Sequence, residues 1–251
     1  MKLLLDLGNT RVKWAVLDRG NSIARGAVAW NDDVESLLAA VWGSLGKVAQ
    51  IYGASVVDAA REARVEAIAD IVCGRNVDWL RTPAQACGVR SAYAEPERLG
   101  VDRFLAMVSA FHDGHAACVL VGVGTALTLD ALNADGRHLG GLIAPGPQLM
   151  QQSLWGATAR VRPESGRVLD AADNTADAVV SGCWQAAVAL IERFVQRMSP
   201  QLDGAPQVIL GGGDAAQLQP LLAMPTQLTE DSVLRGLAVW AEAHSTTLPP
   251  L

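Results

Sequence analysis

Residues 2–13 read KLLLDLGNTRVK and contain the pattern that decides the fold. An apolar run at 2–6 is followed by the turn sequence LGNT, after which apolar and other residues alternate through 12–17. Alternation with a period of two is typical of a half-buried strand. A short glycine turn between two such runs predicts a β-hairpin.

The remainder of the first half continues as an α/β pattern. It predicts a strand at 24–30, a helix at 33–46, a strand at 49–54, a helix at 57–72 and a strand at 77–81. The helix at 33–46 is expected to begin after the capping residues Asn31-Asp32 and to end at Gly46.

The second half repeats the opening. It predicts strands at 117–123, 126–132, 137–143 and 207–210, a helix at 174–198 and closing helices to about 244, with the terminal STTLPPL frayed. Alignment of the two openings places Asp6 opposite Gly122 and Gly8 opposite Gly124. We therefore expect two similar α/β domains, 1–107 and 108–251, with a cleft between them and a linking helix that starts near Asp102.

Composition excludes several classes of protein. Of the 251 residues, 50% are hydrophobic and 18% charged, so a sizeable core is available. The net charge of −6 argues against a nucleic-acid partner. The longest uncharged stretch, 139–159, contains two prolines and three glutamines and is not expected to span a membrane. The four cysteines form no C-x-x-C pair, which favours reduced thiols in a cytoplasmic protein.

Residues 6–13 combine the groups that a nucleotide triphosphate needs. Gly8 permits close backbone approach, Asn9 and Thr10 can donate hydrogen bonds, and Lys13 adds positive charge. Asp6 ends the strand with a carboxylate suited to a metal ion. The alternative is that Gly-Asn is only a turn that connects two strands.

Two further motifs extend this pattern. Residues 124–130, GTALTLD, offer a second glycine-hydroxyl turn that could grip a polyphosphate. Residues 100–103, GVDR, open an amphipathic helix, where Asp102 could accept a proton from an attacking hydroxyl and Arg103 could bind an anionic group. The alternative for Asp102 is a helix N-cap.

These motifs, together with GGLIAPG at 140–146, resemble in order and spacing the type III pantothenate kinases, over residues 1 to about 245. That family belongs to the superfamily of acetate and sugar kinases, Hsp70 and actin. The resemblance implies a duplicated ribonuclease-H-like (actin-like ATPase) fold, a homodimer, and ATP- and Mg²⁺-dependent phosphorylation of pantothenate to 4′-phosphopantothenate, the first step of coenzyme A synthesis.

The resemblance also assigns roles to individual residues. The first phosphate turn would be Asp6, Leu7, Gly8, Asn9, Thr10, Arg11, Val12 and Lys13, with Asp6 on Mg²⁺ and with Thr125 contacting ATP from the second turn. Asp102 would be the catalytic proton acceptor. Pantothenate would be held by Tyr93, Gly100, Val101, Asp102, Arg103 and Thr175, and the glycines at 211–213 would pass near adenosine.

Several alternatives stay open. Tyr93 could be a packing residue, Thr175 could cap the long helix, and the glycines of 140–146 could serve only a bend. His112, His115 and Cys118 are spaced like metal ligands, although Gly114 between them indicates a helix end. The family commonly carries an acid at the position of Gly122 that binds K⁺ or NH₄⁺; without it, backbone carbonyls could hold the ion, or the requirement could be lost. Rival functions are a nucleotide-binding regulator without turnover and a kinase of another small alcohol.

Overall fold

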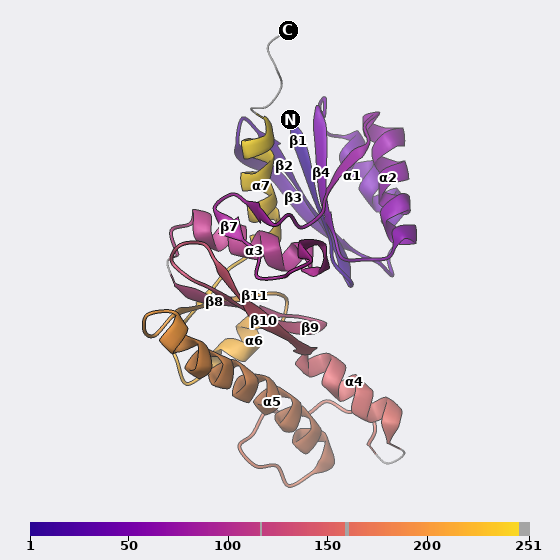
Figure 1. The fold of residues 1–251 in the computed structure, drawn as a ribbon. Helices are drawn as coiled ribbons and strands as arrows, with labels where there is room; N and C mark the ends of the chain where they lie inside the picture. The colour runs from indigo at the N-terminus through magenta and orange to yellow at the C-terminus, as the bar shows by residue number, and fades with distance from the viewer. Residues whose placement is uncertain (116, 159–160, 246–251) are drawn as a thin grey trace. The chain divides into compact units, whose positions relative to one another are not determined.

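The computed structural model describes residues 1–115, 117–158 and 161–245. The chain divides into two compact units (Figure 1). Met1–Gly114 and the C-terminal segment from Ser232 form the first unit, and His115–Asp231 forms the second. The first unit extends to Gly114, where the expected boundary was between residues 107 and 108, and it also contains the C-terminal helix, which was expected in the second domain. The expectation of a frayed end at 246–251 lies outside the described residues.

The first unit contains a five-stranded mixed sheet. Its strands are β1 (Lys2–Leu7), β2 (Arg11–Asp18), β3 (Asn21–Ala29), β4 (Gln50–Ser55) and β5 (Val77–Leu80), in the order β3-β2-β1-β4-β5. The hairpin strands β1, β2 and β3 pair antiparallel, whereas β4 pairs parallel with both β1 and β5. The predicted opening hairpin and the strands that follow it are confirmed.

Helices cover both faces of this sheet (Figure 1). On one face, α1 (Val34–Gly43) and α2 (Ala59–Cys73) bury a core that includes Leu3, Leu5 and Trp42. On the other face, α3 (Val101–His112) and α7 (Ser232–Ser245) pack on Leu4 and Tyr52. Both faces of β1 are therefore buried, which explains its uninterrupted leucine run.

Local signals set the helix ends. Asp33 caps α1 by accepting a hydrogen bond from Ser36 N at 3.2 Å, one position after the predicted cap. Asp58 caps α2 in the same way through Arg61 N at 2.9 Å, and Gly74 ends α2 in the left-handed region at φ 60°. Such side-chain acceptors satisfy the first amides of a helix, and glycine tolerates the left-handed ending.

The second unit repeats the strand order of the first. Its strands are β8 (Cys118–Val123), β9 (Ala126–Leu132), β10 (His138–Pro145), β11 (Gln207–Gly211) and β12 (Thr226–Leu228), arranged β10-β9-β8-β11-β12. The first three strands again pair antiparallel, and β11 pairs parallel with β8 and β12. The expected duplication is therefore present in the order and direction of all five strands.

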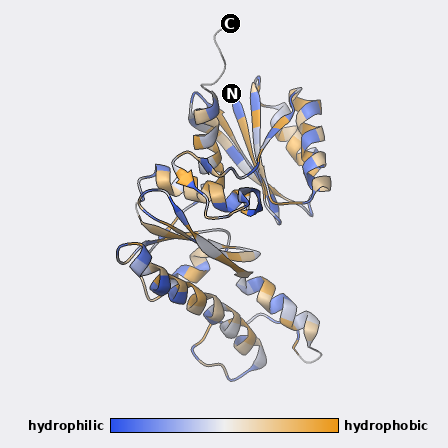
Figure 2. Cartoon of the chain, in the orientation of Figure 1, coloured by the Kyte–Doolittle hydropathy of each residue, from blue (hydrophilic) through white to orange (hydrophobic). Residues whose placement is uncertain are grey.

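One long helix, α5 (Thr175–Met198), covers a face of the second sheet. Its buried residues include Trp184, Ile191 and Phe194, which pack against the strands in the core of this unit. Figure 2 shows hydrophobic and hydrophilic positions mixed along α2 and α5, as expected for helices with one buried side. Among the described residues, the span Thr175–Gln201 has the length and apolar composition to cross a membrane, but half of its apolar window is buried. It is the core helix of this unit.

The sequence did not predict α4 (Pro147–Ala157). Its signal was present, since Gly146 precedes Pro147 at the first helical position, where a missing N–H costs nothing. Other short elements were also not anticipated, namely β6 (Gln85–Ala86), β7 (Val89–Arg90) and the 3₁₀ turns at Pro96–Arg98 and Ser199–Gln201. The predicted closing helices are present as α6 (Ala215–Leu218), the 3₁₀ turn Gln219–Leu221 and α7, but the unpredicted strand β12 interrupts them.

Candidate functional site

The first turn (residues 8–11) joins β1 to β2. Asp6 lies opposite Lys13 and Leu7 opposite Val12 in the antiparallel register. The Gly8 amide donates to the Arg11 carbonyl at 3.1 Å. Leu7 and Val12 are fully buried, so they anchor the hairpin in the core. Asn9, Thr10 and Arg11 are exposed at its tip, whereas the Asp6 side chain at the strand end is 9% exposed.

The fold does not require glycine at position 8. A Cβ there would have Arg11 O at 3.6 Å as its nearest neighbour, an ordinary van der Waals contact. Its φ is also outside the left-handed range. The interpretation of Gly8 as a mere turn residue therefore has no steric support, and open space beside a backbone is what close approach by a ligand needs.

The second turn (residues 124–125) occupies the same place in the second unit. A Cβ on Gly124 would meet no atom within 4 Å, and this glycine also has no left-handed φ. Thr125 is exposed at the tip. Gly8 and Gly124, which occupy equivalent positions in the two openings, thus both have room for a Cβ atom.

Two other glycines hold this second turn in place. The Gly146 amide donates to Thr125 O at 2.9 Å, and a Cβ on Gly146 would collide with the Gly124 carbonyl oxygen. Gly212 has φ 98°, and a Cβ there would collide with the carbonyl of Val123. Of the glycines in the GGLIAPG motif, Gly146 is therefore required for close packing against the turn.

Position 122 differs from its counterpart Asp6. A Cβ on Gly122 would lie 2.5 Å from Thr128 Oγ1, the residue opposite it in the β8–β9 register. The Thr128 hydroxyl thus occupies the space into which a side chain at 122 would project. A carboxylate at this position would require Thr128 to move.

Asp102 lies in the first turn of α3, but it is not the N-cap. Gly100 occupies the cap position, and Asp102 Oδ1 accepts from Arg103 N at 2.8 Å. A Cβ on Gly100 would lie 2.6 Å from the same Oδ1, so this glycine makes room for the carboxylate. The alternative interpretation of Asp102 as the cap is wrong, although its charge still complements the helix dipole.

Arg103 and Tyr93 meet beside the start of α3. Arg103 is 6% exposed, and its Nη1 donates to the Tyr93 hydroxyl at 3.2 Å. Its guanidinium carbon lies 6.0 Å from the centre of the Tyr93 ring. The family resemblance assigned both residues to pantothenate, and the two side chains are in contact.

Thr175 is the first residue of α5 and is exposed. The cap is Asn174, whose Oδ1 accepts from Asp177 N at 2.9 Å. The alternative interpretation of Thr175 as the cap is therefore wrong. Thr125 and Thr175 belong to the second unit, whereas Asp6, Tyr93 and Asp102 belong to the first.

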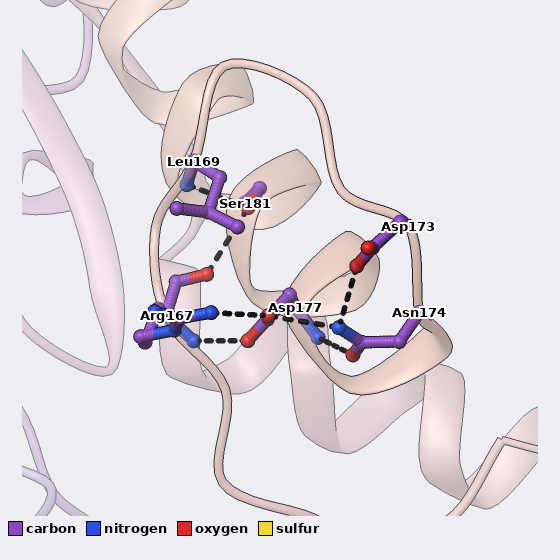
Figure 3. A network of polar contacts seen from close by, with 6 residues as sticks. All are labelled: Arg167, Leu169, Asp173, Asn174, Asp177 and Ser181. Carbon is purple, nitrogen blue, oxygen red and sulfur yellow. Dashed lines mark hydrogen bonds and ion pairs between the residues drawn. The ribbon is translucent and has the colours of Figure 1, made fainter.

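A polar network ties the chain before α5 to the helix (Figure 3). Asp177 accepts from the Arg167 amide at 2.6 Å and from Asn174 Nδ2 at 2.9 Å. Ser181 Oγ accepts from Leu169 N at 2.9 Å. The amide of Arg167, and next the side chain of Asn174, hold the pKa of the Asp177 carboxyl below its usual range. This network fixes the segment that leads to Thr175.

The histidine and cysteine spacing does not produce a metal cluster in the described part of the chain. His112 ends α3, while His115 Nδ1 lies 2.7 Å from Gln207 Oε1. Cys118 is buried in β8, which raises the pKa of its thiol to about 12. A thiol that stays protonated is a poor ligand.

Trp30, which contacts the first turn, was not among the predicted site residues. Its indole Nε1 donates to the Gly8 carbonyl at 2.7 Å. No local pattern could have indicated this contact, because it joins positions 22 residues apart through the sheet.

A cavity of about 420 Å³ lies within the second unit, beside α4 and α5. Gln148, Gln151, Trp155 and Trp184 are among the residues that line it. It contains none of the residues predicted for the site.

Comparison with known proteins identifies related chains. The family model described as type III pantothenate kinase matches residues 2–197. A type III pantothenate kinase of Xanthomonas campestris pv. campestris (strain B100) is 43% identical over 245 residues, covering 96% of this chain and 97% of the relative. That of Laribacter hongkongensis is 40% identical over 238 residues, covering 95% and 97%.

The fold has relatives among solved structures. MreB 5 of Spiroplasma citri superposes with a TM-score of 0.53 at 10% identity, covering 98% of this chain and 97% of that one. This likeness, with the repeated strand order, identifies the duplicated ribonuclease-H-like ATPase fold.

Proposed function

The chain belongs to the type III pantothenate kinase family, and we propose on that basis that it transfers the γ-phosphoryl group of ATP to the hydroxyl of pantothenate. The product is 4′-phosphopantothenate, the first intermediate of coenzyme A biosynthesis. The observation that carries this proposal is the match to type III pantothenate kinases over nearly the whole chain.

The first turn is proposed to bind the ATP phosphates. Support comes from the exposed tip residues, the open space at Gly8 and the positive charge of Lys13 opposite Asp6. Backbone amides and small side chains at a glycine turn are suited to phosphate oxygens. In the second unit, Thr125 is proposed to contact ATP through its hydroxyl.

Asp6 fits the role of the Mg²⁺ ligand, because its carboxylate oxygens are hard donors and it is the second-last residue of the buried strand β1. When bound, the metal neutralises charge on the phosphates. Asp6 would hold it through the carboxylate.

Asp102 is proposed to orient the attacking hydroxyl of pantothenate and to accept its proton late in the transfer. The free hydroxyl is a far weaker acid than the Asp102 carboxyl, so alignment of the nucleophile is the main contribution. Transfer is direct and in line. Arg103, with its planar fork of donors, is proposed to pair with the pantothenate carboxylate. Gly100, Val101, Tyr93 and Thr175 complete the proposed substrate contacts.

A carboxylate-held monovalent cation does not fit position 122. Residue 122 is glycine and has no carboxylate, and a Cβ there would lie 2.5 Å from Thr128 Oγ1. We propose that K⁺ or NH₄⁺, if used by this chain, is held by other groups, and that dependence on the ion is weaker than an acid at 122 would give.

The active form is proposed to be a homodimer in the cytoplasm. Support for dimerisation comes from apolar side chains on the edge strand β10 and on α4, namely Leu142, Ile143, Leu149 and Leu154, which are 41%, 63%, 37% and 39% exposed. Exposed apolar groups on an edge strand are typical of an interface. All four cysteines are free thiols, which fits a reducing compartment.

A coupled ADP-release assay tests the function. The wild-type chain is expected to release ADP only when both ATP and pantothenate are present, and a panel of sugars and other alcohols should give no turnover. Asp102→Asn should lower kcat by about 10³-fold, within the range for a lost general base. Its melting temperature should stay near that of the wild type, because Gly100 is the cap. Nucleotide binding without pantothenate-dependent turnover would favour the regulatory alternative.

A further inference from the structure

Trp30 donates hydrogen bonds to two carbonyl groups of the first turn, those of Gly8 and Thr10. Its indole Nε1 donates to Gly8 O at 2.7 Å, and its backbone amide donates to Thr10 O at 3.1 Å. The residue directly follows β3, so its own backbone is fixed by the sheet. One side chain and one backbone group from the same residue thus set the orientation of two peptide planes of the turn.

The orientation of these carbonyls also sets the orientation of two amides. In a trans peptide the C=O of one residue and the N–H of the next point in opposite directions, and the described residues contain no cis bond. With Gly8 O and Thr10 O directed at Trp30, the N–H groups of Asn9 and Arg11 are directed away from it. Successive backbone amides of a turn can form an anion-binding surface.

Two arginines of α2 hold the Trp30 ring. The guanidinium carbons of Arg61 and Arg64 lie 5.2 and 5.9 Å from the centre of the ring. Arg64 is itself held by Glu35 through hydrogen bonds of 2.6 and 3.0 Å. Cations within about 6 Å of an indole face are attracted to it. The ring that donates to Gly8 is therefore fixed from a second element.

We infer that Trp30 is a positioning residue for ATP: its two hydrogen bonds direct the Asn9 and Arg11 amides toward the phosphates. This inference rests on the proposed function of the first turn as a phosphate site. In this role Trp30 acts through the turn. A hydrogen bond that stabilises bound ATP equally in the ground state and in the transition state lowers KM and leaves kcat unchanged. Its loss should therefore raise KM.

Trp30→Phe tests the inference, because it removes the donor and keeps an aromatic ring. We expect the Kd for a non-hydrolysable ATP analogue and the KM for ATP to rise roughly tenfold, the size of one lost hydrogen bond. The kcat and the KM for pantothenate should stay unchanged. Trp42→Phe is the matched control, since Trp42 is buried on α1 and its Nε1 has no acceptor among the described residues. It should leave both constants for the nucleotide unchanged.

A second measurement uses the wild-type chain and needs no variant. The Asn9 and Arg11 amide resonances should shift when the ATP analogue is added with Mg²⁺. Absence of these shifts, or a Kd for Trp30→Phe within twofold of that for Trp42→Phe, would overturn the inference. The proposed function is tested separately by ADP release, because a chain that binds ATP as expected but does not phosphorylate pantothenate leaves the role of Trp30 intact.

Discussion

The guanidinium of Arg103 donates a hydrogen bond of 3.2 Å to the hydroxyl of Tyr93, ten positions earlier in the chain. Arg103 lies in the first turn of α3 and is buried, whereas Tyr93 precedes the helix and is half-buried. Tyr93 therefore helps to fix the orientation of the Arg103 guanidinium, which we propose pairs with the pantothenate carboxylate.

Tyr93→Phe should raise the KM for pantothenate about three- to tenfold, because Arg103 loses one neutral acceptor that holds its geometry. The KM for ATP should not change. Initial rates at varied pantothenate concentration measure the effect. Tyr52→Phe is the control, since Tyr52 is the other tyrosine and packs edge-on against Trp240. Equal effects of the two variants would refute a positioning role for the Tyr93 hydroxyl.

Gly8→Ala should impair ATP binding without loss of stability, whereas Gly146→Ala should lower stability. Gly8→Ala is expected to keep the wild-type melting temperature, since its Cβ would meet only Arg11 O at 3.6 Å. It should raise the KM for ATP about tenfold by obstructing backbone approach. Gly146→Ala should instead lower the free energy of unfolding by about 1–3 kcal/mol, because its Cβ collides with the Gly124 carbonyl. Urea unfolding and ATP kinetics on both variants measure the contrast, and a destabilised Gly8→Ala would contradict it.

Asp177→Asn should reveal a pH-dependent contribution to stability. The pKa of the Asp177 carboxyl is held below 3.8, chiefly by the Arg167 amide. A lowered folded-state pKa stabilises the fold above 3.8, and this contribution disappears as the pH falls through the lowered value. The difference in free energy of unfolding between wild type and variant should therefore be largest near neutral pH and shrink in acid. A difference that stays constant over this range would exclude the linkage.

Ile143→Glu should favour the monomer. Ile143 is 63% exposed on the edge strand β10, so a charge there disturbs no buried contact within the chain. At a dimer interface the same charge would be desolvated without a partner. Light scattering coupled to size exclusion should show half the wild-type mass, with unchanged circular dichroism. Ile71→Glu is the control, because Ile71 is 83% exposed on α2, and it should leave the mass unchanged.

Replacement of K⁺ by a bulky organic cation should change turnover by less than about tenfold, the amount expected where no carboxylate holds the ion. The physical reason is that residue 122 is glycine and supplies no carboxylate to the ion. ADP release measured with K⁺, NH₄⁺ and tetramethylammonium salts checks this. Complete loss of turnover without K⁺ or NH₄⁺ would indicate a strong site built from other groups.

Local sequence was sufficient to predict the two hairpins and the residues that form their turns. The alternation in residues 12–17 and the glycines at 8 and 124 act over a few positions, where sterics and hydrophobic periodicity dominate. The alternative assignment of Asp102 and Thr175 as caps was wrong, because a preceding residue, Gly100 or Asn174, occupies the cap in each helix. Such one- or two-residue shifts depend on the helix start that packing selects.

The sequence by itself determined that the chain contains two copies of one α/β pattern, each with a glycine turn after its first strand. Only the tertiary structure decided that α7 returns to the first unit, that Gly146 packs on the second turn, and that the indole of Trp30 meets Gly8. These relationships join residues far apart in the chain, and they form because burial of apolar faces brings distant elements together. A pattern with a period of a few residues carries no information about which distant element will supply the partner.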